Sequence, residues 1–373
     1  MPMKIIIITG PFAAIPPYSF SAIEKCWYDC AQEFKKMGND VLFISKKPNY
    51  SVHDTDDCIY IKGYDRSGND LLDKVWREFF YAVRALNRVK KCDILVLNSI
   101  FTPVFVPFYK KKYKVAVYNV ARMPKRQMSL YGGVDMLSCV SSSVRDMLLS
   151  QSPRLRNKSC VISNPVNTDY FYYEPKQCSK NPKVIYSGRI HPEKGIDILC
   201  ESIERLNEEG MRIGLTLVGP TDVAHGGGGD KYTNMLNSIA KSYKIEYIGA
   251  IRESVLLAKE LRKGDIFCYP SVAEMGETFG VAPLEAMALG LPTVLSSLAC
   301  FTDFATDGES ALFFDHRSEN RIIQLSHLIR QLVEDTSLYE RISIGGAESA
   351  KNFSTDEIAL KYMSLFDELL SKK

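Results

Sequence analysis

Short β-branched runs alternate with amphipathic helical stretches along almost all of this 373-residue chain. That alternation is typical of parallel sheets covered by helices on both faces, because each parallel crossover needs room for a helix. The runs that we predict as strands are Lys4–Thr9, Asp40–Ser45, Cys58–Lys62, Asp93–Asn98, Lys114–Asn119, Met136–Val140, Ser159–Ile162, Val184–Gly188, Arg212–Gly219, Ile245–Ile248, Asp265–Tyr269 and Thr293–Ser296.

The alternation is interrupted at Asn164–Lys183, where prolines are frequent and no periodicity persists. We therefore predict two α/β domains, residues 1–168 and 180–354, each long enough to enclose its own core. Apolar positions at helical spacing place Trp27 and Trp76 in two helices of the first domain, where we expect both rings to serve packing.

Composition narrows the function classes. The net charge of +3 is small for a protein that binds a phosphate backbone, so we expect no nucleic-acid partner. The ten cysteines are scattered without C-x2-C pairs, which favours reduced thiols over metal sites. We find no apolar run of about 18 residues, the length that a membrane span needs. Because Met1–Lys4 leads directly into the first strand, we expect a cytoplasmic protein without a signal peptide.

The segment Gly276–Gly290 carries two carboxylates, Glu277 on a glycine-containing loop and Glu285 in the first turn of the helix that follows. Between them are three backbone N–H groups that we expect to face the same space, as an anion site requires, those of Phe279, Gly280 and Val281. Carboxylates can accept hydrogen bonds from the hydroxyls of a sugar, and backbone N–H groups can donate to a phosphate. The two kinds of group together suit a sugar nucleotide as the ligand. The alternative is an acidic surface loop before an ordinary helix.

A second strand-to-helix junction, Ser187–Gly195, carries two cations, Arg189 and Lys194. Ligands of parallel sheets bind at the carboxyl edge of the strands, where these residues fall. Arg can clamp two phosphate oxygens in plane and Lys acts as a point charge, so the pair could stabilise a departing diphosphate without a metal. A solvated basic loop is the alternative. Further strand ends fit a nucleoside pocket through Gly219, Ile248 and Gly249.

The pattern F-G-x-x-x-x-E-A-M-A-x-G-x-P, which begins at Phe279, resembles the signature of glycosyltransferase family 4. Members of that family are retaining, metal-independent enzymes of the GT-B architecture. The resemblance implies two Rossmann-like domains with parallel sheets that face a central cleft. It also implies that a C-terminal helix, residues 355–373, crosses back to the first domain.

For the site, the resemblance implies that Arg189 and Lys194 hold the donor pyrophosphate and that Glu285 accepts hydrogen bonds from the ribose diol. Glu277 would lie beside the hydroxyls of the donor sugar, with Thr278 in the same loop. We expect Glu277, Arg189 and Lys194 to be catalytic, and we expect no cofactor and no metal, since the nucleotide-diphosphate sugar is itself a substrate.

The first domain departs from the family pattern. Where members commonly carry paired glycines after the first strand, this chain has Tyr18-Ser19-Phe20-Ser21. Many members also place a histidine after a later strand, but the corresponding stretch Tyr118–Met123 has none and contains Arg122. We take Tyr18, Ser19, Ser21 and Arg122 as acceptor-side candidates. The D-x-D at Asp54–Asp56 we interpret as a solvated loop.

A basic stretch could rest on an anionic membrane. Residues 109–130 contain seven Lys or Arg and no acid, with aromatic residues close by. Family members that act on lipid-linked acceptors work at the inner leaflet, so we expect either peripheral binding there or a solvated basic loop.

These observations predict a retaining glycosyltransferase that moves a hexose from a UDP or GDP donor to a saccharide or lipid-linked acceptor, in surface polysaccharide or glycolipid assembly. A nucleotide-sugar epimerase or phosphorylase on the same plan remains an alternative. Another is a sugar-nucleotide-binding subunit whose altered first domain has weakened catalysis.

Overall fold

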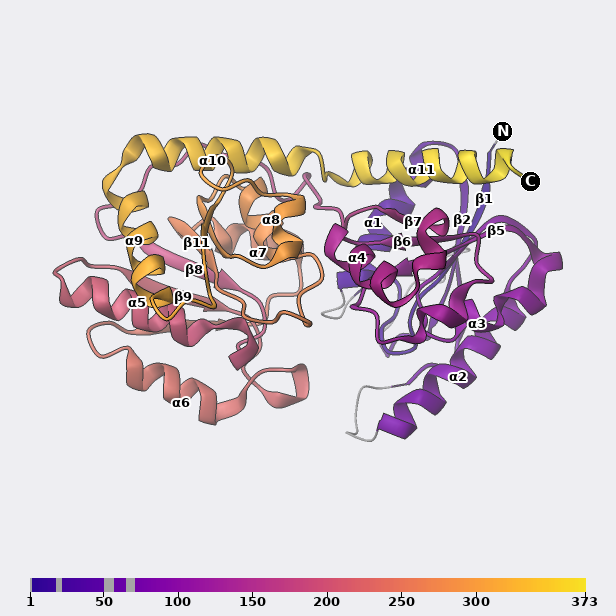
Figure 1. The fold of residues 1–373 in the computed structure, drawn as a ribbon, viewed down its shortest axis with the longest axis horizontal. Coiled ribbons are helices and arrows are strands. Elements are labelled where there is room, and N and C mark those ends of the chain that lie inside the picture. The colour runs from indigo at the N-terminus through magenta and orange to yellow at the C-terminus, as the bar shows by residue number, and fades with distance from the viewer. Residues whose placement is uncertain (1, 18–21, 50–56, 65–70) are drawn as a thin grey trace. The chain divides into compact units, whose positions relative to one another are not determined.

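The computed structural model describes residues 2–17, 22–49, 57–64 and 71–373, and it divides into two compact units (Figure 1). Unit 1 comprises Met1–Pro165 and Thr355–Lys373, and unit 2 comprises Val166–Ser354. The chain therefore leaves unit 1, builds unit 2 and returns to unit 1 for its last helix.

The described part of unit 1 contains a seven-stranded parallel sheet of order β3-β2-β1-β4-β5-β6-β7. Its strands are β1 Lys4–Ile8, β2 Asp40–Lys46, β3 Cys58–Ile61, β4 Cys92–Leu97, β5 Tyr113–Val120, β6 Met136–Cys139 and β7 Ser159–Val161. Its α-helices are α1 Ala22–Lys36, α2 Leu71–Arg88, α3 Thr102–Phe105, α4 Ser142–Gln151 and α11 Thr355–Ser371, with 3-10 helices η1 Val106–Lys112, η2 Gln127–Tyr131 and η3 Pro153–Lys158.

Unit 1 is held together by a continuous apolar sheet and by the returning helix. Residues 5–8 of β1 are all isoleucine with no exposed surface, which a strand covered on both faces requires. Helix α11 packs on α1 (Figure 1), where the Trp27 and Tyr362 ring centres are 4.8 Å apart and those of Phe34 and Phe366 are 5.9 Å apart. The predicted return of the C-terminal helix to the first domain is confirmed.

Unit 2 repeats the plan with a parallel sheet of order β10-β9-β8-β11-β12-β13. Its strands are β8 Lys183–Ser187, β9 Gly214–Val218, β10 Ile245–Gly249, β11 Ile266–Tyr269, β12 Thr293–Ser296 and β13 Leu312–Phe314. Its α-helices are α5 Ile196–Glu208, α6 Gly229–Ile239, α7 Ser254–Leu261, α8 Val281–Ala288, α9 Arg321–Glu334 and α10 Thr336–Lys351, with 3-10 helices η4 Pro192–Lys194, η5 Val223–His225 and η6 Ala299–Asp303.

Each of the twelve predicted runs overlaps a strand, and the two parallel α/β domains are confirmed. The sequence missed β13, Leu312–Phe314. The prediction that the Trp76 ring serves packing was wrong. Trp27 is buried, but the Trp76 side chain is 57% exposed, because α2 is apolar on more than the face that packs. In the described part of the chain, no helix is both long and apolar enough to cross a membrane.

Candidate functional site

The candidate site lies at the carboxyl ends of β8 and β11, the neighbouring strands at which the strand order of unit 2 reverses. Parallel sheets bind ligands at such switch points, because the crossovers on either side leave a crevice between them. β8 leads into η4, which carries Lys194, and β11 leads into the loop that carries Glu277. The fold therefore brings together two predicted site residues that are 83 positions apart in the chain.

Lys194 and Glu277 form a buried ion pair. Lys194 Nζ lies 2.6 Å from Glu277 Oε2, and the two side chains are only 7% and 11% exposed. The same oxygen accepts hydrogen bonds from the Tyr269 hydroxyl at 3.2 Å and from Ser271 Oγ at 3.3 Å. Because charges out of water are costly unless paired and hydrogen-bonded, these three donors fix the carboxylate before any ligand binds.

Two stacked tyrosines form the wall behind this ion pair. The rings of Tyr186 and Tyr269 lie 5.4 Å apart at 13°, and Lys194 Nζ is 5.4 Å from the centre of the Tyr269 ring. Burial, with a further contribution from the negative charge of Glu277, raises the pKa of both phenols well above their usual value. Both hydroxyls therefore stay protonated, and Tyr186 donates to the carbonyl of Arg189 at 3.0 Å.

Arg189 is the exposed cation of the site. Its guanidinium forms an ion pair with Glu193 and donates to the carbonyl of Gly226 at 3.2 Å. The glycine run at 226–229 therefore contacts the site. Gly228 N–H donates to the carbonyl of Ile190 at 2.7 Å, so this loop is hydrogen-bonded to the loop that carries Arg189.

Close backbone approach explains two glycines of the site. Gly195, which follows Lys194, has φ +62°, and a Cβ there would lie 2.2 Å from the carbonyl oxygen of Pro270. A Cβ on Gly219 would lie 1.8 Å from the carbonyl oxygen of Gly188. Gly219 N–H also donates to the carbonyl of Gly249 at 2.7 Å. The predicted nucleoside-side residues Gly219, Ile248 and Gly249 thus lie at neighbouring strand ends, beside the end of β8.

Helix α8, which follows the loop that carries Glu277, contains a second carboxylate. Gly280 begins the helix with φ +99°, and Glu285 within it is buried, with 6% of its surface exposed. Phe279 is also buried and packs its ring against those of Phe304 and Phe353, so its side chain serves the core and only its backbone could serve a ligand. The remaining loop candidates are half-buried, Thr278 and Val281.

The acceptor-side candidates belong to unit 1. Arg122 follows β5 and is exposed. Tyr18, Ser19 and Ser21 lie outside the described residues, as does the D-x-D at 54–56.

The sequence missed the groups that hold the predicted ones in place. Tyr269 and Ser271 bind Glu277, and Glu193 binds Arg189, yet none of these was singled out. Tyr269 and Ser271 flank Pro270 at the end of a predicted strand, and that position was the available signal.

Unit 1 has a buried acid at its own switch point that the sequence also missed. Glu78 of α2 is 7% exposed and accepts a hydrogen bond from Ser99 Oγ, just after β4, at 2.8 Å. Burial raises the pKa of Glu78, and the bond from Ser99 and the positive charge of Arg122 oppose that rise. Glu24 is buried too, and its Oε1 lies 3.4 Å from the N–H of Gly10, which follows β1.

Comparison with known proteins finds a family model that is similar to the second half of the chain. Residues 174–349 match the family model described as glycosyl transferases group 1. The match covers less than half of the chain and lies within unit 2, which is therefore similar to a group 1 glycosyltransferase domain. The matched segment includes the junction with Arg189 and Lys194 and the whole of Gly276–Gly290.

Two curated relatives and one solved structure extend the comparison. An uncharacterized glycosyltransferase of Methanocaldococcus jannaschii is 25% identical over 63% of this chain and 60% of its own length. Phosphatidyl-myo-inositol mannosyltransferase of Mycobacterium leprae is 26% identical over 58% of this chain and 55% of its own length. The match therefore spans little more than half of each relative. The structure of Anabaena HepE in complex with UDP and glucose has a TM-score of 0.72 at 15% identity, over 98% of this chain and 100% of that one. The fold is GT-B.

Proposed function

We propose that this protein is a retaining, metal-independent glycosyltransferase of family 4, which moves a hexose from a UDP or GDP donor to a saccharide or lipid-linked acceptor. The observation that carries the proposal is the buried Lys194–Glu277 pair beside Arg189, at the switch point of a domain that is similar to a group 1 glycosyltransferase domain. The mannosyltransferase name of one relative supports a hexose and a lipid acceptor, and the UDP of one structural neighbour supports a uridine donor.

In this mechanism the bond between sugar C1 and the diphosphate oxygen breaks, and the bond from an acceptor hydroxyl oxygen to C1 forms on the same face. The leaving oxygen keeps the bonding electrons and takes the acceptor's proton. Arg189 and Lys194 offset the negative charge that grows on the diphosphate. Glu277 accepts from the donor sugar's hydroxyls and Glu285 from the ribose diol, roles that suit acceptor-only carboxylates.

Donor binding tests the proposal without knowledge of the acceptor. A panel of UDP- and GDP-hexoses should raise the melting temperature for the cognate donor, because a ligand that binds the folded state stabilises it by RT ln(1 + [L]/Kd). Arg189→Ala should weaken that donor about ten- to hundredfold, the cost of a lost charged hydrogen bond. Lys263→Ala is the control. It removes an exposed cation that pairs with Glu260, and it should leave the affinity for the donor unchanged. Equal affinity in all three proteins would contradict the assignment.

Product analysis separates the alternatives. Transfer to an added acceptor, with release of nucleoside diphosphate, supports a glycosyltransferase in surface polysaccharide or glycolipid assembly. A changed sugar nucleotide without an acceptor would indicate an epimerase, and dependence on free phosphate would indicate a phosphorylase. Tight donor binding without any reaction would indicate a binding subunit.

We also propose that unit 1 binds peripherally to an anionic membrane, on the inner leaflet in a cytoplasmic location. Part of the basic stretch 109–130 is already used within the fold, since Lys110 and Lys114 form ion pairs with Asp135 and Asp93. Exposed aromatic side chains could supply the apolar contacts with the bilayer that these paired cations do not make. Phe108 is 83% exposed, and Trp76 of α2 lies exposed beside Phe80 with ring centres 6.0 Å apart. Aromatic rings with nearby cations are typical of interfacial surfaces.

Vesicle sedimentation tests the membrane proposal. Wild type should sediment with vesicles rich in phosphatidylserine at low salt, and Trp76→Ser with Phe80→Ser should weaken that binding. A paired change on unit 2, Val255→Ser with Leu256→Ser, removes exposed apolar side chains of α7 and serves as the control. If wild type fails to sediment at both low and high salt, the membrane proposal is wrong.

A further inference from the structure

A buried histidine connects three strand ends of unit 2, outside the residues that we assign to the donor. His316 follows β13, and its side chain is only 3% exposed. One ring nitrogen, Nε2, lies 3.0 Å from Glu274 Oε1, on the loop after β11. The other, Nδ1, lies 3.5 Å from Ser297 Oγ, directly after β12. Because β12 pairs with both β11 and β13, the imidazole joins the carboxyl ends of three adjacent parallel strands.

The partners of this ring fix its tautomer. A carboxylate only accepts hydrogen bonds, so in the neutral imidazole the proton lies on Nε2 and is donated to Glu274. Nδ1 then accepts from the Ser297 hydroxyl. Because a buried N–H group is costly to leave without an acceptor, the ring of His316 holds the Glu274 carboxylate in one place.

Glu274 has a second partner at its exposed end. Arg317 Nη2 lies 2.6 Å from Glu274 Oε1, but the two side chains are 52% and 49% exposed. An ion pair exposed to that extent contributes little, because solvent screens it and competes for both groups. Arg317 also donates to the Ser297 hydroxyl at 3.3 Å. The buried imidazole of His316, rather than the exposed guanidinium, therefore fixes the carboxylate.

Glu274 lies in a compact turn, residues 272–277. Two backbone hydrogen bonds close this turn, since the N–H groups of Gly276 and Glu277 both donate to the carbonyl of Ala273, at 3.0 and 2.9 Å. A turn closed in this way moves as one piece. Whatever fixes the side chain of Glu274 therefore also fixes the backbone that carries Glu277.

Both ends of the turn contact an ion pair of the candidate site. At its start, the N–H of Val272 donates to the carbonyl of Glu193 at 3.0 Å, and the carboxylate of Glu193 binds Arg189. At its end, Glu277 binds Lys194. A displaced turn would therefore shift the anionic partners of both cations that we assign to the donor diphosphate.

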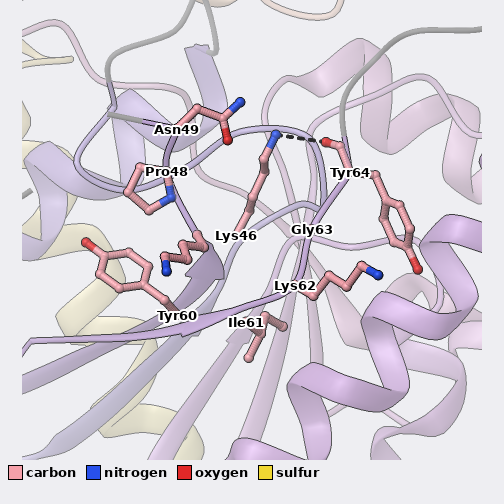
Figure 2. A pocket seen from close by; sticks show the side chains of 9 residues that line it. Lys46, Pro48, Asn49, Tyr60, Ile61, Lys62, Gly63 and Tyr64 are labelled. Atoms are coloured by element: carbon pink, nitrogen blue, oxygen red, sulfur yellow. Dashed lines mark hydrogen bonds between the residues drawn. The ribbon is translucent and has the colours of Figure 1, made fainter. Parts of the chain in front are cut away.

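Unit 1 contains a simpler tie between strand ends. Lys46, the last residue of β2, donates from Nζ to the carbonyl of Tyr64 beyond β3 at 3.0 Å, the dashed line in Figure 2. This bond lies in the wall of a pocket of about 520 Å³ and ends on a backbone carbonyl. It joins two strand ends without involving a residue that we assign to the donor. The tie through His316 differs, because the turn that it holds carries Glu277.

We propose that His316 is a positioning residue for the donor. It acts through Glu274, which it holds so that the turn 272–277 presents Glu277 to the donor sugar and keeps Glu193 beside Arg189. This role requires no contact between the buried imidazole and the donor. The inference rests on the proposed function, because it assigns His316 to the donor of that reaction.

Variants of the two partners of Glu274 test the inference. His316→Leu removes both ring nitrogens and should weaken the cognate nucleotide sugar about tenfold, the lower end of the cost of a charged hydrogen bond. His316→Gln keeps an N–H donor in place of Nε2 and should restore affinity to within about threefold of wild type. Arg317→Gln, the matched control, removes the exposed partner and should also stay within about threefold. Isothermal titration with the donor found by the thermal-shift panel measures all four proteins.

A double variant shows whether His316 acts through Glu274. Glu274→Ala alone should weaken the donor about as much as His316→Leu does. The two changes together should add no further loss, because effects that pass through one contact are not additive. Losses that add in full would mean that His316 acts by another route, and would overturn the inference.

Amide hydrogen exchange, read by mass spectrometry, follows the turn without any ligand. In His316→Leu, the peptide that covers 272–277 should exchange about tenfold faster than in wild type, and His316→Gln should restore the slow rate. The peptide that covers α6 is the control and should exchange at an unchanged rate. A merely structural role would speed exchange across unit 2 and lower the melting temperature, but it would leave the donor affinities of His316→Leu and Arg317→Gln equal.

The inference and the proposed function fail in different ways. Equal donor affinity in wild type and His316→Leu would overturn the inference and leave the proposed function standing. If wild type binds none of the nucleotide sugars, the proposed function fails, and hydrogen exchange alone decides whether His316 positions the turn. Unchanged exchange over 272–277 would then overturn that role, and faster exchange confined to the turn would retain it.

Discussion

At the scale of single residues, Lys194 and Glu277 form a buried ion pair, and we propose that both also bind the donor. A double-mutant cycle separates the two roles. Lys194→Met or Glu277→Gln alone leaves its buried partner uncompensated, which costs about 3–5 kcal/mol at a fully buried pair. The two changes together remove both charges and should cost less than the sum of the single changes. Urea unfolding measures all four proteins.

Donor binding should follow a different pattern in the same four proteins. The double variant should recover stability but lacks the two charges that we propose face the donor, so it should bind the nucleotide sugar no better than either single variant. Recovery of donor affinity in the double variant would show that the pair is purely structural.

Glu78 should make the stability of unit 1 depend on pH. Burial raises its pKa in the folded chain. The folded state therefore binds the proton more tightly than the unfolded state does. The stability that this provides is fully present below the unfolded value of about 4.3 and is lost as pH rises through the folded pKa. Glu78→Gln should remove that loss of stability. The urea midpoint of the variant should therefore rise relative to that of wild type as the pH increases from 4 to 8. Glu208→Gln, on an exposed face of α5, is the control, and its urea midpoint should show the same pH dependence as that of wild type.

At the scale of elements, the β8–η4–α5 junction depends on Gly195. Gly195 and Gly210 both have positive φ, +62° and +95°, so alanine at either position carries the strain of a left-handed residue, about 1–2 kcal/mol. Only at Gly195 would the new Cβ meet backbone, 2.2 Å from the carbonyl oxygen of Pro270, whereas nothing lies within 4 Å at Gly210.

Gly195→Ala should therefore destabilise the chain more than Gly210→Ala. It should also weaken donor binding, because Pro270 can yield only by moving the segment that carries Ser271, which binds Glu277. Thermal unfolding and the donor thermal shift measure the two effects. Equal losses for the two variants would mean that the junction tolerates the displacement.

The same junction shows how much of the site the sequence could predict. The strand-to-helix position of Arg189 and Lys194 follows from hydrophobic periodicity, and so does the loop position of Glu277 before α8. The pairing of Lys194 with Glu277, 83 positions apart, does not follow from periodicity, because it depends on β11 lying beside β8 in the sheet. Tyr269 and Ser271 became site residues only because β11 lies beside β8, whereas the carbonyl of Gly226 reaches Arg189 from the loop after β9, on the other side of β8. Sequence therefore predicted the charged groups expected to meet the donor and missed the groups that hold them, which include the charged Glu193.

At the scale of the whole molecule, the two units should unfold as separable bodies, because each encloses its own core and sheet. The chain offers a built-in reporter. It has two tryptophans, Trp27 and Trp76, and both belong to unit 1. Trp27 contacts Tyr362 of α11, so tryptophan fluorescence follows the unit that the returning helix completes. Far-UV circular dichroism follows both units together.

Matched core substitutions then assign each transition. Ile358 of α11 and Ile329 of α9 have no exposed surface, and replacement by valine typically costs about 0.5–1.5 kcal/mol. Ile358→Val should lower the urea midpoint seen by fluorescence, whereas Ile329→Val should lower only a second transition, seen by circular dichroism. The cognate donor should raise that second transition alone, because its predicted phosphate and ribose contacts all belong to unit 2. If Ile329→Val shifts the fluorescence midpoint as much as Ile358→Val does, the two units unfold as one, and the returning helix couples donor binding to the stability of the acceptor-side unit.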